Sequence, residues 1–179
     1  MPRGRGTGAR LRAALAVGAL LVPALLGVAA PRGSGETISL SGNEPGQRLD
    51  VTLTRVVDPA GPAGPALAGR SLPRSAGPVP TGSERLVAVG FRLENTGTAV
   101  YVDEPAAAAH LVDTSGRRFT GVDAPTTAGP AFPGTVTLDP GASAEGFVAF
   151  RIPADAGPAA VQFALNGGLA DDVGQWSLP

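Results

Sequence analysis

Short runs of alternating apolar and polar residues, each closed by a turn, constrain the fold of this chain more than any other feature. The run RLDVTLTRVVD carries apolar residues at alternate positions: Leu49, Val51, Leu53 and Val57. A period of two is typical of a strand with one buried face. Arg55 interrupts the apolar side near the end of the run. The sequence therefore predicts a half-buried strand here.

Further runs repeat this alternation between turn signals. The stretch GFRLENTGTAVYVDEP holds two of them, divided at residues 95–97, where glycine and asparagine tolerate a positive φ. Residues 139–141, Asp-Pro-Gly, form another turn, because proline presets φ and glycine permits the reversal. A helical period is absent except at residues 106–109, which are too few for a helix. The predicted strands lie at residues 85–93, 98–104, 111–112, 117–120, 135–138, 146–152 and 161–165.

The number and spacing of these strands indicate the fold class. Seven to nine short strands in roughly 140 residues predict an all-β, immunoglobulin-like antiparallel β-sandwich. The domain occupies residues 37–179, after a polar spacer at residues 31–36. A closed barrel is the alternative, and the uneven strand spacing favours the sandwich.

An export segment precedes the domain. Four arginines come before an uncharged apolar run at residues 13–30, the order of charged and apolar regions in a signal peptide. Small residues at 27–30 resemble a cleavage site, whereas Pro31 directly after them hinders cleavage. The run is also close to the roughly 20 residues that cross a bilayer. Residues 1–30 are therefore either a signal peptide or an N-terminal membrane anchor, and the domain is secreted or held on the outer face of the cytoplasmic membrane.

Charge and cysteine content exclude several classes of protein. Four of the 14 arginines and none of the 15 acidic residues lie in residues 1–30, so the rest of the chain carries a formal charge of −5. This charge is unsuited to nucleic acid, which binds positive surfaces. The absence of cysteine excludes disulfides, thiol catalysis, cysteine-based metal sites and a lipid anchor on cysteine.

One long segment fits neither a helix nor a strand. Residues 59–83, PAGPAGPALAGRSLPRSAGPVPTGS, contain too many prolines and glycines for either. The two Gly-Pro-Ala triplets are too few for a collagen helix. Loops of this length inside a compact domain are often functional or disordered. We therefore expect binding here first.

His110 is the single histidine, so a Ser-His-Asp arrangement would have to use it as the base. It lies at the start of a predicted strand, where an ordinary surface histidine is the simpler interpretation. With one histidine and no cysteine, a copper or zinc site is excluded.

Oxygen ligands for calcium remain conceivable, because six acids fall at predicted loops or strand ends. No EF-hand spacing is present, and solvated acids that keep loops and edges soluble explain them better. We assign no catalytic, cofactor-binding or metal-binding residue. The six acids are Asp103, Glu104, Asp113, Asp123, Asp171 and Asp172.

Tyr101 and Trp176 have two interpretations. They could be exposed anchors for a partner, since large aromatic side chains are common at interfaces. They could equally close the ends of the core. The sequence leaves both open.

The order of strands and turns resembles a family of exported bacterial immunoglobulin-like domains of unknown function, found in lipoproteins and secreted proteins. The secreted mycobacterial immunoprotective protein has a similar sandwich. The shared pattern is a strand ending in Asn-x-Gly, a hairpin with Asp-x-x-Gly, and a Pro-Gly turn before a Gly-x-x-x-Phe-x-x-Pro strand. The resemblance implies the sandwich fold and supplies no catalytic residues. Its elements fall on Asn95, Gly97, Asp113, Gly116, Pro140, Gly141, Gly146, Phe150 and Pro153.

These features predict a non-catalytic extracytoplasmic module that binds a protein or cell-envelope partner through loops, especially residues 59–83. An architectural spacer in an envelope assembly is the alternative. A hydrolase that uses carboxylates is less favoured, because one sequence cannot show which carboxylates lie close together.

Overall fold

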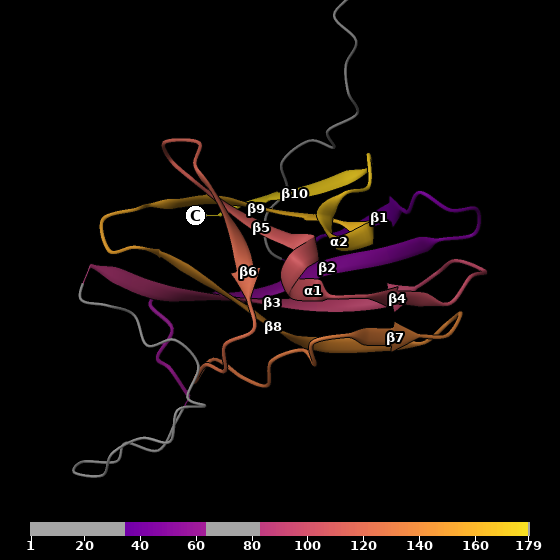
Figure 1. Ribbon diagram of the computed structural model, residues 1–179, viewed down its shortest axis with the longest axis horizontal. Coiled ribbons are helices and arrows are strands. Elements are labelled where there is room, and N and C mark those ends of the chain that lie inside the picture. Colours follow the sequence, from indigo (N-terminus) through magenta and orange to yellow (C-terminus); the bar gives the residue numbers. More distant parts are fainter. Residues whose placement is uncertain (1–34, 64–82, 179) are drawn as a thin grey trace, which may run out of the picture.

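A computed structural model describes residues 35–63 and 83–178, which form an antiparallel β-sandwich (Figure 1). This confirms the fold class that the alternating runs predict. The strands are β1 (Thr37–Ser41), β2 (Arg48–Val57), β3 (Glu84–Asn95), β4 (Tyr101–Asp103), β5 (Ala109–Asp113), β6 (Arg118–Val122), β7 (Val136–Leu138), β8 (Ser143–Pro153), β9 (Pro158–Ala164) and β10 (Val173–Ser177).

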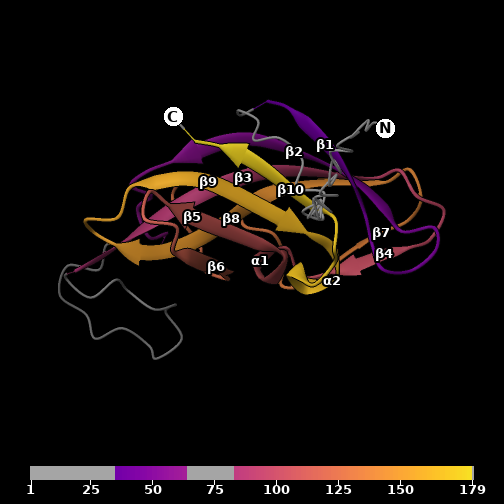
Figure 2. The ribbon, with the colours of Figure 1, turned by 90° about the horizontal axis from the view of Figure 1, so that it is seen from above.

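The strands form two layers that meet at β6. Eight of them pair in the order β1-β2-β3-β8-β6-β5-β9-β10, and every pair is antiparallel. One layer holds β1, β2, β3 and β8, and the other holds β5, β9 and β10 (Figures 1 and 2). The short strands β4 and β7 form a separate pair at one end.

One side of the sandwich is closed by backbone pairing. The first half of β6 pairs with β5, and its last two residues pair with β8. The change of layer begins at Gly121, where an added Cβ would lie 2.5 Å from the carbonyl oxygen of Ala106 and 2.5 Å from Val148 Cγ1. Only glycine fits this approach, so residue 121 fixes where the strand crosses.

The other side is closed by side chains between β1 and β10. The indole Nε1 of Trp176 donates to the carbonyl oxygen of Glu36 over 2.9 Å, and the amide of Ser41 donates to Asp172 Oδ2 over 2.9 Å. These bonds use backbone groups at the edge that could otherwise pair with another chain.

The core lies between the layers and is built from the alternate apolar residues. Phe91 on β3 packs edge-on against Phe163 on β9, with ring centroids 5.4 Å apart, and against Trp176 on β10, at 6.1 Å. All three side chains are fully buried. Trp176 and Tyr101 are both core residues, so the interpretation as exposed anchors is wrong.

A bulge in β2 corrects one assignment. The register with β3 shifts between Leu53 and Arg55, so the alternation does not continue to Val57. Val56 packs on the main core instead, and Val57 faces a second, smaller cluster on the outer side of β3. Arg55 was the sequence signal of the irregularity. The small cluster contains Ala60, Leu86 and Ala88, with Val57, Ala128 and Phe147 against it.

The structure has more elements than the sequence analysis predicts. Strand β1 was missed because only Ile38 and Leu40 mark its alternation, and β10 was not recognised as a strand. One helical turn, α1 (Pro105–Ala108), begins at a proline suited to the first helical position. A second, α2 (Leu165–Gly168), follows β9 and contains left-handed residues. Both are single turns, consistent with a chain that has no helical period.

The export segment and most of the long loop lie outside the described residues, which exclude 1–34 and 64–82. The predictions of a signal peptide or anchor at residues 1–30 stay predictions. Within the described ranges no helix is long and apolar enough to cross a membrane.

Candidate functional site

The two ends of the sandwich differ, and each is defined here by its connections. The turn end consists of residues 42–47, 96–104, 139–142 and 165–172. The loop end consists of residues 58–63 with 83, 113–117 and 153–157. In Figure 1 the turn end holds the β4–β7 pair, and the β8–β9 turn lies at the opposite end.

Asn95 organises the turn end. Its side chain is 1% exposed and donates through Nδ2 to the carbonyl oxygens of Ala99, at 2.9 Å, and Leu138, at 2.8 Å. Its Oδ1 accepts the amide of Gly97 over 3.0 Å. A buried amide is stable only when its donors and acceptor are satisfied. The asparagine that marked a turn in the sequence therefore also ties β7 to the β3–β4 turn.

Gly97 allows two connections to touch. Its amide donates to the carbonyl oxygen of Arg48, and an added Cβ would overlap the carbonyl oxygen of Gly46. The Asn-x-Gly pattern thus has a packing reason beyond the turn. It lets residues 96–100 lie directly on residues 46–48.

Side chains connect the remaining segments of the turn end. The amide of Asn43 donates to Asn166 Oδ1 over 3.0 Å, and Asn166 has a left-handed φ of 58°. The amide of Gly167 donates to both carboxylate oxygens of Asp103, at 3.0 and 3.1 Å. Together with the bond from Ser41 to Asp172, these contacts join residues 42–47, 96–104 and 165–172. The fourth segment is joined to them by the amide of Gly141, which donates to the carbonyl oxygen of Asn95.

The turn end carries exposed apolar side chains. Val100 is 48% exposed, Val102 is 60% exposed and Leu169 is 80% exposed. Among the described residues they are all of the exposed large apolar side chains. Scattered apolar residues are normal on a surface, and the restriction of all three to one end makes that end the candidate interaction site.

None of these three residues is among the binding residues predicted from the sequence, although the sequence carries signals of their exposure. In TAVYVDEP the apolar residues are consecutive instead of alternate, which places apolar side chains on both faces of β4. Leu169 is an apolar residue inside an Asn-Gly-Gly turn. Either pattern could have suggested an exposed apolar residue.

The four segments of the turn end contain six acids and no arginine, and the exposed Arg48 directly follows the first segment. These acids are Glu44, Asp103, Glu104, Asp139, Asp171 and Asp172. An open depression of about 460 Å³ is lined by two of these acids, Asp171 and Asp172, and by residues 41–43. The turn end is therefore acidic and partly apolar.

The loop end uses its charges differently, as Arg85 illustrates. Its Nε and Nη2 contact the two carboxylate oxygens of Asp58 at 2.8 and 3.0 Å. Its remaining donors reach the carbonyl oxygens of Pro153, Ala154 and Ala156. These bonds fasten both sides of the long loop to the β8–β9 turn. Hydrogen bonding to Asp58 raises the pKa of Arg85, although burial opposes it.

Asp113 corrects the interpretation of the acids as solvated. Its side chain is buried inside the β5–β6 turn and accepts bonds from the amides of Ser115 and Arg117 and from the hydroxyl of Ser115. Arg117 Nε donates to its other oxygen over 2.7 Å. Burial alone would raise the pKa of Asp113, but the hydrogen bonds outweigh it and lower the pKa to about 2. Asp113 stabilises its own hairpin.

His110 lies half-buried on β5, between Thr120 and Gln162 of the neighbouring strands. Gly168 covers the ring so closely that an added Cβ would be 2.9 Å from Cε1. Burial lowers the pKa of His110, and the charge of Arg118 lowers it further. Among the described residues no serine or carboxylate hydrogen-bonds to the imidazole. The structure does not bring a Ser-His-Asp set together here.

The six acids weighed as calcium ligands, and interpreted instead as solvated, do not converge. Four of them lie at the turn end, Asp113 lies at the loop end, and Asp123 follows β6. Within residues 35–63 and 83–178, no three histidine, aspartate or glutamate residues are grouped so that they could hold a metal ion.

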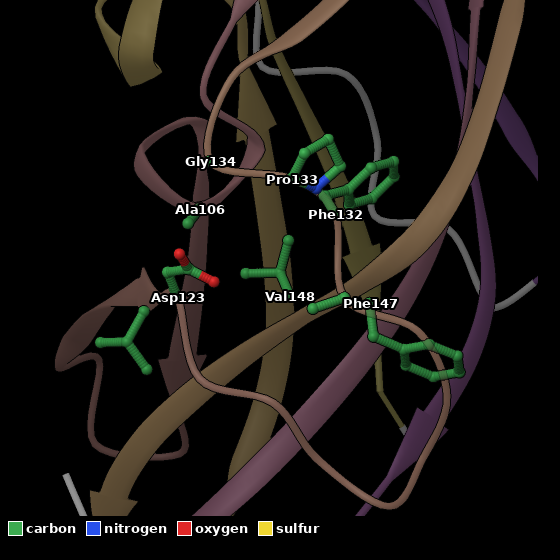
Figure 3. A pocket seen from close by; sticks show the side chains of 9 residues that line it. Ala106, Asp123, Phe132, Pro133, Gly134, Phe147 and Val148 are labelled. Atoms are coloured by element: carbon green, nitrogen blue, oxygen red, sulfur yellow. The ribbon is translucent and has the colours of Figure 1, made fainter. Parts of the chain in front are cut away.

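A small pocket lies beside α1, between β8 and the connection that leads from β6 to β7 (Figure 3). Its walls include Ala106, Phe132 and Val148, with Asp123 at one side. Its volume of about 10 Å³ is that of one water-sized sphere. Organic ligands occupy pockets of about 300–1,000 Å³, so this pocket is too small for one.

Fold and surface together define a small antiparallel β-sandwich module with one acidic, partly apolar end. Among solved structures, it is similar to the secreted protein MPT63 from Mycobacterium tuberculosis, with a TM-score of 0.52 and 14% identity over 84% of this chain and 100% of that one. It is also similar to the yjhA protein from Bacillus subtilis, with a TM-score of 0.50 and 15% identity over 83% of this chain and 99% of that one.

A third similar structure is the lipoprotein candidate ycdA from Bacillus subtilis, with a TM-score of 0.51 and 13% identity over 79% of this chain but only 39% of the longer ycdA chain. No protein-family model and no curated protein sequence matches the chain. The resemblance to exported bacterial β-sandwich proteins is thus confirmed at the level of the fold.

Proposed function

We propose that the protein is a non-catalytic extracytoplasmic module that binds a protein or cell-envelope partner at its turn end. The observation that carries the proposal is that all three exposed large apolar side chains of the described residues, Val100, Val102 and Leu169, belong to that end. Interfaces commonly combine an apolar centre with a polar rim. The surrounding acids supply such a rim.

The extracytoplasmic part of the proposal has two supports. Residues 1–30 have the charge and hydropathy order of an export segment. Similar folds occur in a secreted protein and in a lipoprotein candidate. Mass spectrometry of the N-terminus, in the culture supernatant and in the membrane fraction, tests the location. A protein confined to the cytoplasm contradicts it.

The sequence analysis placed binding at residues 59–83, most of which lie outside the described residues, and that version stays a prediction. Photo-crosslinking in intact cells separates the two ends. A photoreactive residue at Val102 or Leu169 should yield an adduct with the partner, and one at the exposed loop-end residue Thr114 should not. Adducts at Thr114 alone, or none at the turn end, would overturn the turn-end proposal.

Two variants test, by loss of binding, whether the partner contacts the turn end or the long loop. Val102→Asp with Leu169→Asp should abolish capture of the crosslinked partner and leave the melting temperature nearly unchanged, because both side chains are exposed. Deletion of residues 70–80 should leave the capture of a partner other than this chain intact. Capture that is lost on the deletion and kept in the turn-end variant assigns binding to the loop. Capture that survives both changes favours the architectural alternative.

A further inference from the structure

Arginine and acidic residues are distributed unevenly between the described and the remaining parts of the chain. The described residues hold seven of the 14 arginines and all 15 acids, a formal charge of −8. The turn end contributes six of those acids and no arginine. A surface of this kind attracts a segment that combines positive charge with apolar side chains.

The chain itself contains such a segment. Residues 64–82, GPALAGRSLPRSAGPVPTG, carry Arg70 and Arg74, no acid, and the apolar residues Leu67, Leu72 and Val79. Residues 1–30 also combine arginine with apolar residues, but an export segment is either removed or held in the membrane. Residues 64–82 remain with the exported domain in both cases.

The position of the loop favours a second copy over the same molecule. Arg85 and Asp58 fasten the loop to the loop end, and the amide of Ala154 bonds the carbonyl oxygen of Ser83 there. Strand β3, which joins the two ends, has 12 residues, a length of about 40 Å. Nineteen extended residues reach at most about 65 Å. Reaching the turn end of the same copy and returning would take about 80 Å, which is more than this segment can span.

We propose that the turn end binds residues 64–82 of a second copy of this chain, so that the molecules associate head to tail. The inference rests on the proposed function, because it names the partner of the same surface. Val102 and Leu169 contact the apolar residues of the incoming segment, and the acids Glu104 and Asp171 face its arginines. The two surfaces are different, so the contact is heterologous and adds copies in a line unless it closes into a ring.

Two variants of the exported protein test this geometry. Variant one carries Val102→Asp and Leu169→Asp and keeps its loop. Variant two carries Arg70→Glu and Arg74→Glu and keeps its turn end. In sedimentation velocity the wild-type protein should form dimers and larger species as its concentration rises. Each variant alone should be monomeric, whereas an equimolar mixture should form dimers that grow no further.

A matched control and a defined probe complete the experiment. Thr114→Asp adds a charge at the loop end and should associate like the wild type. A labelled peptide of residues 64–82 should bind the wild type and variant two, and should bind variant one at least about tenfold more weakly. Raising the salt concentration should weaken binding in every case.

The outcomes also separate this inference from the proposed function. A wild-type protein that is monomeric at every concentration and does not bind the peptide overturns the inference. If variant one nevertheless loses the partner captured in cells, the proposed function stands with another occupant. If variant one keeps that partner and also associates normally, both are wrong.

Discussion

The two ends of the sandwich contain similar residues and use them in different ways. At the loop end, acids lie beside arginines: Asp58 with Arg85, and Asp113 with Arg117. At the turn end, Asp103 and Asp172 accept backbone amides, and the remaining acids face solvent without an arginine. Arginines neutralise acids within the loop end, whereas most acids of the turn end stay free to interact with another molecule. An acidic residue in a loop therefore suggests a binding role only when no side chain of the same molecule already pairs with it.

The largest effect is expected where the turn end is closed most tightly. Gly97→Val places a side chain against the backbone of Gly46 and Arg48, and should destabilise the fold by about 3 kcal/mol or more. Urea unfolding measures the change. Gly134→Ala is the control, since an added Cβ meets nothing there within 4 Å. Equal stability of the two variants would mean that the contact between residues 46–48 and 96–98 is unimportant.

A smaller effect is expected at the loop end. Arg85→Ala removes the donors to Asp58 and to three carbonyl oxygens, and the side chain is 22% exposed. The loss should be about 2–3 kcal/mol. Arg92→Ala is the matched control, because the Arg92–Glu94 pair is exposed and such pairs contribute about 0–1 kcal/mol. A loss of stability no larger than that of Arg92→Ala would mean that Arg85 does not hold the loop end together.

The second loop-end acid predicts a pH dependence. The pKa of Asp113 is lowered to about 2 in the folded protein, below the value of about 3.9 in an unfolded chain. A lowered pKa stabilises the fold above the unfolded value, and this contribution is lost as the pH falls from about 4 to about 2. Asp113→Asn should therefore be less stable than the wild type at neutral pH, and the difference should shrink over that interval. A difference that stays constant with pH contradicts this account.

The smallest effect is expected at the base of the turn end. Tyr101 is 5% exposed, and its hydroxyl has no hydrogen-bond partner among the described residues. Burial, with the charge of Asp103, raises the pKa of Tyr101. Tyr101→Phe removes an unsatisfied hydroxyl and should change stability by less than about 1 kcal/mol, in the stabilising direction. A clear loss of stability in thermal unfolding would reveal a bond to that hydroxyl.

Most of the strands and turns of the sandwich could be predicted from the sequence, because alternation and turn residues are local signals. The run from Gly90 to Pro105 was correctly assigned to a strand, a turn and the next strand. The bulge after Leu53 could not be placed, because register depends on the neighbouring strand.

The turn end as a candidate site was harder to predict than the strands and turns of the sandwich. Its exposed residues come from β4, from the residue before it and from the turn after β9, and β4 and that turn are joined by bonds across more than 60 residues of sequence. The role of Arg85 is similarly invisible, since its partners lie 27 to 71 residues away. Local patterns carry no information about which distant segments meet.

The side-chain seam between β1 and β10 has a consequence for any larger assembly. Trp176 holds the last strand to Glu36, so the polypeptide enters and leaves the domain along one edge. Thr37 pairs with Thr52, while Ser41 pairs with Arg48 beside the turn end, so the point of entry is set back from that end. A tether or a fused neighbour attached along this edge would thus leave the turn end, with its acids and exposed apolar residues, pointing away from the point of attachment.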